Sequence, residues 1–165
     1  MSSISRTPTI TAEKPKARWL PPRWVVRTAW AAHRAIYRFR GGRRVLHTPS
    51  HGKWGVMRLT TIGRQSGKAR NAILGYVEDG PNLVTLAMNG WATTDPAWWR
   101  NLQVRPEVTV ELADGKRAVR GRAAYSEERD RLWAKFRAHS EWGDVDHFAG
   151  RRTGETAVVV LEPRP

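Results

Sequence analysis

A short basic segment, Gly63 to Arg70, contains the residues whose types and spacing point most directly to chemistry. It reads GRQSGKAR, with Arg64, Lys68 and Arg70 as cations and Ser66 as a hydroxyl. Its two glycines permit tight turns and expose backbone N–H groups. Guanidinium groups and clustered amides are donors that suit phosphates and carboxylates. The segment therefore predicts a site for a polyanionic small molecule, although a solvated basic hairpin without a ligand fits the same pattern.

The basic segment differs from the common nucleotide-binding loops, and the chain lacks the usual metal ligands. Neither GxxxxGK[ST] nor GxGxxG occurs in the segment. The chain has no cysteine, which excludes disulfides, thiolate metal sites and cysteine nucleophiles. His47 and His51 are four residues apart, but Pro49 between them argues against a helix that presents both imidazoles to one metal. We therefore expect ordinary loop histidines and no metal site.

A second segment, residues 87–102, has a composition that suits a planar ring. Gly90 allows the backbone to approach a ligand closely, and Asn89 and Asn101 offer amide hydrogen bonds. Three tryptophans in the segment offer flat apolar surface: Trp91, Trp98 and Trp99. Trp98 also fits a core position, which is the alternative we favour for it. Asn101 is harder to explain as a core residue.

The elements that must position these two segments are mainly short strands. The residue pattern predicts strands over 54–62, 71–77, 83–88, 108–112, 116–125 and 157–161, of which 108–112 alternates as a half-buried strand does and 157–161 is a continuous apolar run typical of a buried strand. Asp114-Gly115 is a strong hairpin signal. Two inserted helices are expected, one begun by Asp95-Pro96 and one capped by Ser126. Six short strands with glycine-rich turns favour an α+β fold built on a small, largely antiparallel barrel.

The N-terminal region sets the expected domain boundary. Residues 1–18 are rich in Ser, Thr, Pro and Lys and are expected to be a disordered tail, which leaves residues 19–165 as a single domain. Residues 24–39 have the spacing of an amphipathic helix, which either packs on the domain or touches an anionic membrane through residues 19–40. No signal peptide or apolar run of ~20 residues is present. We expect a cytoplasmic protein, with peripheral contact at the inner face of the plasma membrane as an open alternative.

The net charge adds one general expectation. The formal charge is +14 at pH 7. An excess of this size implies an anionic partner, which can be nucleic acid, a membrane surface or a phosphate- or carboxylate-bearing ligand. Charge alone does not distinguish these partners.

Three runs of sequence resemble the deazaflavin-dependent nitroreductase family: TTIGRQSGKAR, LGYVEDG and NGWATTDPAWWRNLQVRPEVTVEL. The likeness extends over roughly Leu20 to Pro163 and is most specific between Leu59 and Leu112. It implies a split β-barrel related to flavin-binding oxidase folds, with coenzyme F420 as the hydride carrier. This deazaflavin bears a phosphodiester, a carboxylate and a polyglutamate tail, which would account for the cations of the basic segment.

The resemblance also implies which residues contact the coenzyme. Arg64, Ser66, Gly67 and Arg70 match the family's phosphate-contacting loop, and Ala87, Trp98 and Asn101 match positions near the coenzyme. The rest of the predicted coenzyme site consists of Gln65, Lys68, Met88, Asn89 and Gly90, of which Gln65 and Met88 depart from the family pattern. The predicted acceptor pocket consists of Tyr76, Trp91, His139 and Trp142. No catalytic side chain is identified.

The activity implied by the resemblance is hydride transfer from the reduced deazaflavin to a hydrophobic acceptor such as a quinone or a nitroaromatic. Nitroimidazole-reducing members have a tyrosine at the position of Gly75, which this chain lacks. One alternative is therefore a carrier that binds the deazaflavin without turnover. Another is a basic nucleic-acid-binding module, but the cations are spread out and no recognised motif frames them.

Overall fold

The computed structural model describes residues 45–50, 52–139 and 144–165, in which strands predominate. The strands are β1 (Gly55–Ile62), β2 (Ala69–Asp79), β3 (Asn82–Leu86), β4 (Glu107–Leu112), β5 (Gly115–Ala123) and β6 (Val158–Pro163). The helices are α2 (Ala97–Val104), α3 (Ser126–Arg137) and α4 (Val145–Ala149), and a short 3-10 helix, η2 (Asn89–Trp91), connects β3 to α2.

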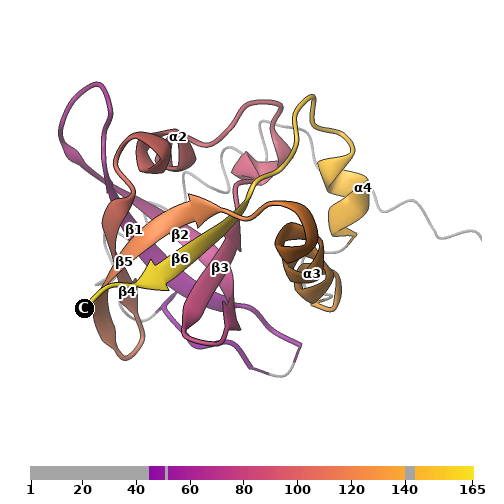
Figure 1. Ribbon diagram of the computed structural model, residues 1–165, viewed down its shortest axis with the longest axis horizontal. Helices are drawn as coiled ribbons and strands as arrows, with labels where there is room; N and C mark the ends of the chain where they lie inside the picture. Colours follow the sequence, from indigo (N-terminus) through magenta and orange to yellow (C-terminus); the bar gives the residue numbers. More distant parts are fainter. Residues whose placement is uncertain (1–44, 51, 140–143) are drawn as a thin grey trace, which may run out of the picture.

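The six strands close into a barrel, shown in Figure 1. Their order around it is β1-β2-β3-β6-β5-β4, and β1 pairs with β4 to complete the circle. Every pairing is antiparallel. The predicted α+β fold with a six-stranded antiparallel barrel is confirmed. The strand ends differ from the prediction by a few residues. For example, β2 begins at Ala69 and β6 extends to Pro163.

Local sequence explains why these strands form where they do. Along β1 the burial alternates strictly, so that Met57, Leu59 and Thr61 face the interior. The predicted hairpin at Asp114-Gly115 is confirmed, since Leu112 pairs with Gly115 across the turn. Gly115 has φ 149°, a conformation that favours glycine.

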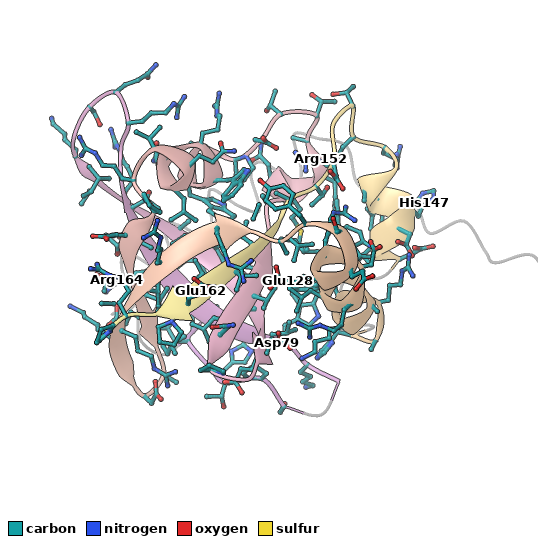
Figure 2. The ribbon with its side chains drawn as sticks, in the orientation of Figure 1. Asp79, Glu128, His147, Arg152, Glu162 and Arg164 are labelled. Carbon is teal, nitrogen blue, oxygen red and sulfur yellow. The ribbon has the colours of Figure 1, made fainter. Side chains whose placement is uncertain are left out.

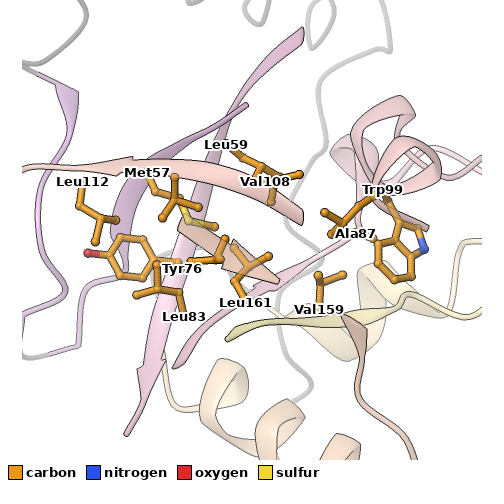
Figure 3. Close-up of a cluster of buried hydrophobic side chains, with 13 residues drawn as sticks. Met57, Leu59, Tyr76, Leu83, Ala87, Trp99, Val108, Leu112, Val159 and Leu161 are labelled. Carbon is orange, nitrogen blue, oxygen red and sulfur yellow. The ribbon is translucent and has the colours of Figure 1, made fainter. Parts of the chain in front are cut away.

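Apolar side chains fill the barrel interior, as Figure 3 shows. Met57, Leu59 and Leu161 are fully buried there, and burying each such side chain contributes roughly 1.5–3 kcal/mol. Tyr76 is also fully enclosed in this core. The placement of Tyr76 in the acceptor pocket stays a prediction, which the enclosed side chain does not support. Successive strand residues face opposite sides, so Tyr76 points inward where its neighbour Gly75 faces outward.

A second core lies between the barrel and the helices α3 and α4. Trp54 and Phe136 meet edge to face in it, with ring centroids 5.1 Å apart. Gly75 makes room for Trp54, since a Cβ at that glycine would lie 2.6 Å from the indole ring. At the end of β2, the Asp79 carboxylate accepts hydrogen bonds from Arg131 at 2.8 Å and from Lys135 at 2.5 Å. These contacts fix α3 against the sheet.

The start of α2 differs from the prediction. Pro96 occupies the N-cap position and Ala97 is the first helical residue, so Asp95 does not cap the helix. The Asp95 carboxylate instead accepts a hydrogen bond from Arg152 at 3.0 Å. The local capping signal of Asp95 is therefore overridden by its contact with Arg152, which lies far along the chain.

The two C-terminal helices also differ from the prediction. Ser126 is the first residue of α3 and has φ 48°, while Tyr125 holds the N-cap position without a side-chain bond. The prediction that Ser126 caps this helix is therefore wrong. Helix α4 was not predicted, because five residues are too few for a periodic pattern. Its cap is Asp144, whose Oδ1 accepts from the backbone N–H of His147 at 3.0 Å.

Some predictions concern residues outside the described part of the chain. The tail over residues 1–18, the helix over 24–39, the membrane contact over 19–40 and Trp142 all lie there. In the described residues, no helix is long and apolar enough to cross a membrane. Those residues also contain no group of three or more His, Asp or Glu side chains arranged to hold a metal ion.

Candidate functional site

The loop between β1 and β2 is the basic segment predicted from the sequence, and it projects beside α2 in Figure 1. The N–H of Gly63 donates to the carbonyl of Lys68 at 2.9 Å, and the N–H of Gly67 donates to the carbonyl of Gly63 at 2.8 Å. Gly67 has φ 66°, and a Cβ at Gly63 would lie 2.6 Å from Ser66 Oγ. The two glycine amides therefore close the loop on itself rather than pointing outward to a ligand.

Asn101 on α2 holds this loop in place from the inside. Its Oδ1 accepts hydrogen bonds from the backbone N–H of Arg64 at 3.1 Å and from Arg64 Nη1 at 3.3 Å. Its Nδ2 donates to Thr61 Oγ1 at 3.2 Å. Asn101 is only 4% exposed, so its amide is occupied by the loop. The side chain that seemed hard to explain as core is a buried polar anchor.

The cations of the loop have no acidic partner among the described residues. Arg64 is half-buried, and Lys68 and Arg70 are exposed. Other arginines are paired: Arg58 with Glu111, and Arg122 with both Glu128 and Glu162. Positive charge on the loop is therefore left uncompensated by this part of the protein, which is the electrostatic condition for binding an anion.

The second predicted segment follows β3. Ala87 is fully buried, its N–H donates to the carbonyl of Ala157 at 3.0 Å, and its carbonyl accepts from Arg152 at 2.9 Å. The next turn is left-handed, with φ 47° at Asn89, 59° at Gly90 and 61° at Trp91. Asn89 and Gly90 are exposed. The polar groups of Ala87 are thus used within the protein, whereas the backbone at Gly90 is open to a ligand.

The remaining apolar residues of this segment are only partly buried. Met88 and Trp91 pack at the edge of the second core, and Trp98 packs against the barrel core. Trp98 also meets Trp99 edge to face, with ring centroids 6.3 Å apart. Trp98 is therefore neither a fully buried core residue nor a free surface residue.

The predicted acceptor residues do not form one cluster in the described part of the chain. Trp91 packs on Phe148 of α4, with ring centroids 5.6 Å apart. His139 lies at the end of α3, where its Nδ1 is 2.7 Å from the carbonyl of Lys135 and its ring meets Trp54. Tyr76 is inside the barrel. Of these residues, Trp91 alone adjoins the segment after β3.

Comparison with known proteins identifies the family. A family model described as "F420H(2)-dependent quinone reductase" matches residues 29–163, which is most of the chain. The chain belongs to the F420H(2)-dependent quinone reductase family. Coenzyme F420 is therefore its cofactor, and the chain is a reductase that depends on the reduced coenzyme.

Individual relatives agree with this assignment. The reductase is 33% identical over 101 residues to a putative F420H(2)-dependent quinone reductase of Mycobacterium tuberculosis, which covers 61% of this chain and 83% of the relative. A second M. tuberculosis protein, named an F420H(2)-dependent quinone reductase, is 29% identical over 134 residues, which covers 80% of this chain and 88% of that protein.

A solved structure supports the fold. The reductase is similar to an F420-H2 dependent reductase, FDR-A, with a TM-score of 0.56 and 25% identity, covering 65% of this chain and 93% of the other. The predicted split barrel and its F420-dependent family are thus confirmed. The matched family is that of the quinone reductases, a narrower description than the nitroreductase resemblance.

Two residues that matter in the reductase were missed from the sequence. Thr61 accepts the Asn101 amide and faces the interior at the end of β1. Its inward position in an alternating strand was a readable signal. Arg152 contacts the segment after β3 from a distant part of the chain, through Ala87, Ala92 and Asp95. Nothing in the local sequence GRRTGE distinguishes it from a solvated arginine.

Proposed function

We propose that the reductase binds the anionic arm of coenzyme F420 on the loop from Gly63 to Arg70 and passes reducing equivalents to a quinone. The observation that carries this proposal is a set of three cations on an anchored loop that have no acidic partner in residues 45–50, 52–139 and 144–165: Arg64, Lys68 and Arg70. Because Asn101 already fixes the loop, little conformational freedom is lost when an anion binds there.

The donor set of the loop fits the phosphodiester and carboxylates of the coenzyme. Guanidinium groups bind such oxygens through charge-assisted hydrogen bonds, which are about twice as strong as neutral ones. Ser66 and Gln65 are exposed beside them and offer further polar contacts. In this proposal Asn101 does not touch the coenzyme but holds Arg64 in position to do so.

The segment after β3 is proposed to lie against the ring of the coenzyme. Gly90 exposes backbone, and the partly buried side chains of Met88, Trp91 and Trp98 supply apolar surface for a flat ring. When bound, the reduced coenzyme supplies the hydride. The residues of the chain orient the ring and exclude water from it. Trp91 and Phe148 offer aromatic faces that suit a quinone.

A titration of the coenzyme, followed by its fluorescence, tests the loop assignment. We expect Arg64→Ala and Arg70→Ala each to weaken binding by about tenfold, the equivalent of one lost charge-assisted contact. Arg131→Ala is the matched control, since it removes the same charge from an arginine that is paired with Asp79. Unchanged affinity in both loop variants would overturn the assignment.

Turnover with a quinone tests the activity. The reduced coenzyme should be oxidised in the presence of a menaquinone analogue, with the rate lowered in Arg70→Ala at subsaturating coenzyme. Tight binding of the coenzyme without oxidation across a panel of quinones and nitroaromatics would instead support the carrier. Binding to DNA that disappears at moderate salt, while coenzyme binding persists, would rule out nucleic acid as the functional partner.

The N-terminal assignments remain predictions. Residues 1–44 contain 11 Lys and Arg and one Glu, a formal charge of +10, so residues 45–165 carry only +4 of the total of +14. This concentration of charge supports the proposed contact of residues 19–40 with an anionic membrane. Co-sedimentation with vesicles that contain anionic lipid, but not with neutral ones, would test it. Limited proteolysis would test the division into a tail over 1–18 and one domain over 19–165.

A further inference from the structure

Arg152 is a buried arginine between α4 and β6, and Figure 2 places it on the α4 side of the connection between β3 and α2. Its side chain is 1% exposed. The guanidinium donates hydrogen bonds to the carbonyls of Ala92 at 2.8 Å and Ala87 at 2.9 Å, to Thr156 Oγ1 at 2.8 Å and to Asp95 Oδ1 at 3.0 Å. Three of these partners lie in the segment 87–95, which is thereby held at its beginning, middle and end.

The geometry of these bonds requires an arginine. A guanidinium has five N–H donors in a rigid planar fork, so one side chain can bond two carbonyls and a carboxylate in fixed directions. A lysine has three donors on a single nitrogen and cannot span the same partners. Because the Arg152 guanidinium is buried, its donors also need partners, since a buried charge is tolerated only when it is paired and hydrogen-bonded.

The segment held by Arg152 has a backbone that needs external support. Asn89 and Trp91 adopt left-handed φ values of 47° and 61°. Asparagine tolerates this region better than most residues, but a tryptophan there is unfavourable. Such conformations persist when the surrounding structure over-determines them. Local bonds contribute, since Asn89 Nδ2 donates to the carbonyl of Thr94 at 3.0 Å. Thr153, the neighbour of Arg152, donates to the carbonyl of Thr93 at 3.4 Å.

We infer that Arg152 is the positioning residue that sets the shape of the segment 87–95 and so the surface this segment presents to the coenzyme ring. This inference rests on the proposed function, in which that segment contacts the ring. Because its side chain is enclosed, Arg152 acts through the segment and does not touch the coenzyme.

Amide hydrogen exchange of the protein without coenzyme tests the positioning directly. In Arg152→Met, exchange of a peptide spanning residues 88–95 should speed up by about tenfold, the equivalent of one lost hydrogen bond. The Trp91 amide, which donates to the carbonyl of Met88 at 2.7 Å, reports on the left-handed turn. Exchange in β1 and β2 should not change.

Coenzyme binding provides the second readout. Arg152→Met should weaken coenzyme affinity by about tenfold and shift the absorbance of the bound coenzyme, measured where the variant is folded by circular dichroism. Arg152→Lys retains the charge and should give a smaller change in the same direction. If Arg152→Met does not fold, the lysine variant decides by the same two readouts.

Arg122→Met is the matched control. Arg122 also donates several hydrogen bonds, to Glu128 and Glu162. These bonds join β5 to α3 and β6 and do not support the segment 87–95. This variant should lower the melting temperature without changing exchange in 88–95 or the bound spectrum. An equal effect of Arg122→Met on both readouts, or unchanged exchange and spectrum in the Arg152 variants, would overturn the inference.

The inference and the proposed function fail in different ways. If Arg64→Ala and Arg70→Ala keep wild-type affinity, the loop assignment is wrong whatever Arg152 does. If those variants lose affinity while Arg152→Met retains wild-type exchange and spectrum, the loop assignment stands and the positioning role of Arg152 is wrong.

Discussion

Arg152 and Arg70 show two opposite uses of the same side chain. Arg152 is enclosed, and its donors are taken up by two carbonyls, a hydroxyl and a carboxylate. Arg70 is exposed and has no ion pair within the described residues. The first arginine can only shape the protein, whereas the second is available to a ligand. The difference indicates that burial and pairing, rather than residue type, decide which cations of a basic protein remain available to a ligand.

The comparison predicts opposite outcomes for stability and binding. Arg152→Met should lower the free energy of unfolding by about 3 kcal/mol, because it removes the donor from the buried carbonyl of Ala87 and from the part-buried carbonyl of Ala92. Arg70→Met should change it by less than about 0.5 kcal/mol, as exposed substitutions usually do. Urea unfolding at neutral pH measures both values. Similar losses of stability in the two variants would contradict the distinction between a structural Arg152 and an available Arg70.

A substitution that gives a loop cation an acidic partner tests whether an unpaired cation is needed for binding. Asn101→Asp keeps an acceptor for Arg64 but places a carboxylate against its guanidinium, which lies 3.3 Å from Oδ1 in the wild type. We expect coenzyme affinity to fall by about tenfold, since part of the positive charge is neutralised. Fluorescence titration measures this effect. Retention of wild-type affinity would show that Arg64 does not meet the anionic arm.

Asp79 is paired with Arg131 and Lys135, and these ion pairs are partly open to solvent. Hydrogen bonds from Arg131 and Lys135 hold the pKa of the Asp79 carboxyl well below its usual range. The unfolded carboxyl has the ordinary pKa, so the stabilisation is present at neutral pH and is lost as pH falls below about 4.

We therefore expect Asp79→Asn to cost about 1 kcal/mol at pH 7 and progressively less below pH 4. Urea unfolding across this pH range tests the difference between wild type and variant. A difference that stays constant with pH would show that the carboxylate pairs contribute nothing to stability.

Tyr76 is the converse case, a buried group that lacks a hydrogen-bond partner in the part of the chain that the structure describes. Its hydroxyl makes no hydrogen bond within the described residues. Burial, followed by the charges of Glu78 and Asp114, raises the pKa of Tyr76 from 10.0 to about 12. The unfolded phenol ionises first as pH rises, so this residue favours unfolding between those two values.

Tyr76→Phe should accordingly change stability by less than about 1 kcal/mol at pH 7. It should also reduce the loss of stability in the alkaline window. The kcat/KM for a quinone should stay at the wild-type value, because the side chain is enclosed in the barrel. A large fall in kcat/KM would return Tyr76 to the acceptor pocket.

Much of the fold could be predicted because its signals are local. The strict alternation along β1 and the Asp114-Gly115 turn each depend on a few neighbouring residues, and both are confirmed. The basic loop was found in the same way, from charges and glycines within eight residues. Its anchor Asn101 stands out in the sequence as a residue that is hard to explain as core, whereas its partner Thr61 was not predicted.

The predictions failed where the cause is distant in the sequence. Asp95 has the residue type of a helix cap. Its carboxylate instead accepts a hydrogen bond from Arg152, which lies 57 residues further along the chain. Ser126 also has the residue type of a cap, but it is the first residue of α3 and adopts a left-handed φ, for which the structure shows no distant partner among the described residues. The role of Arg152 depends on the fold bringing it to the segment 87–95, and no short pattern encodes such an encounter.

The position of the last strand has a consequence for biosynthesis. β6 lies between β3 and β5, so the sheet stays open along two edges until residues 158–163 are available. Arg152 and its partner Thr156 also follow β5 in the chain, between α4 and β6. A chain that has been synthesised only up to β5 therefore cannot close the barrel. Premature termination before β6 should leave exposed strand edges, the form in which β-proteins aggregate.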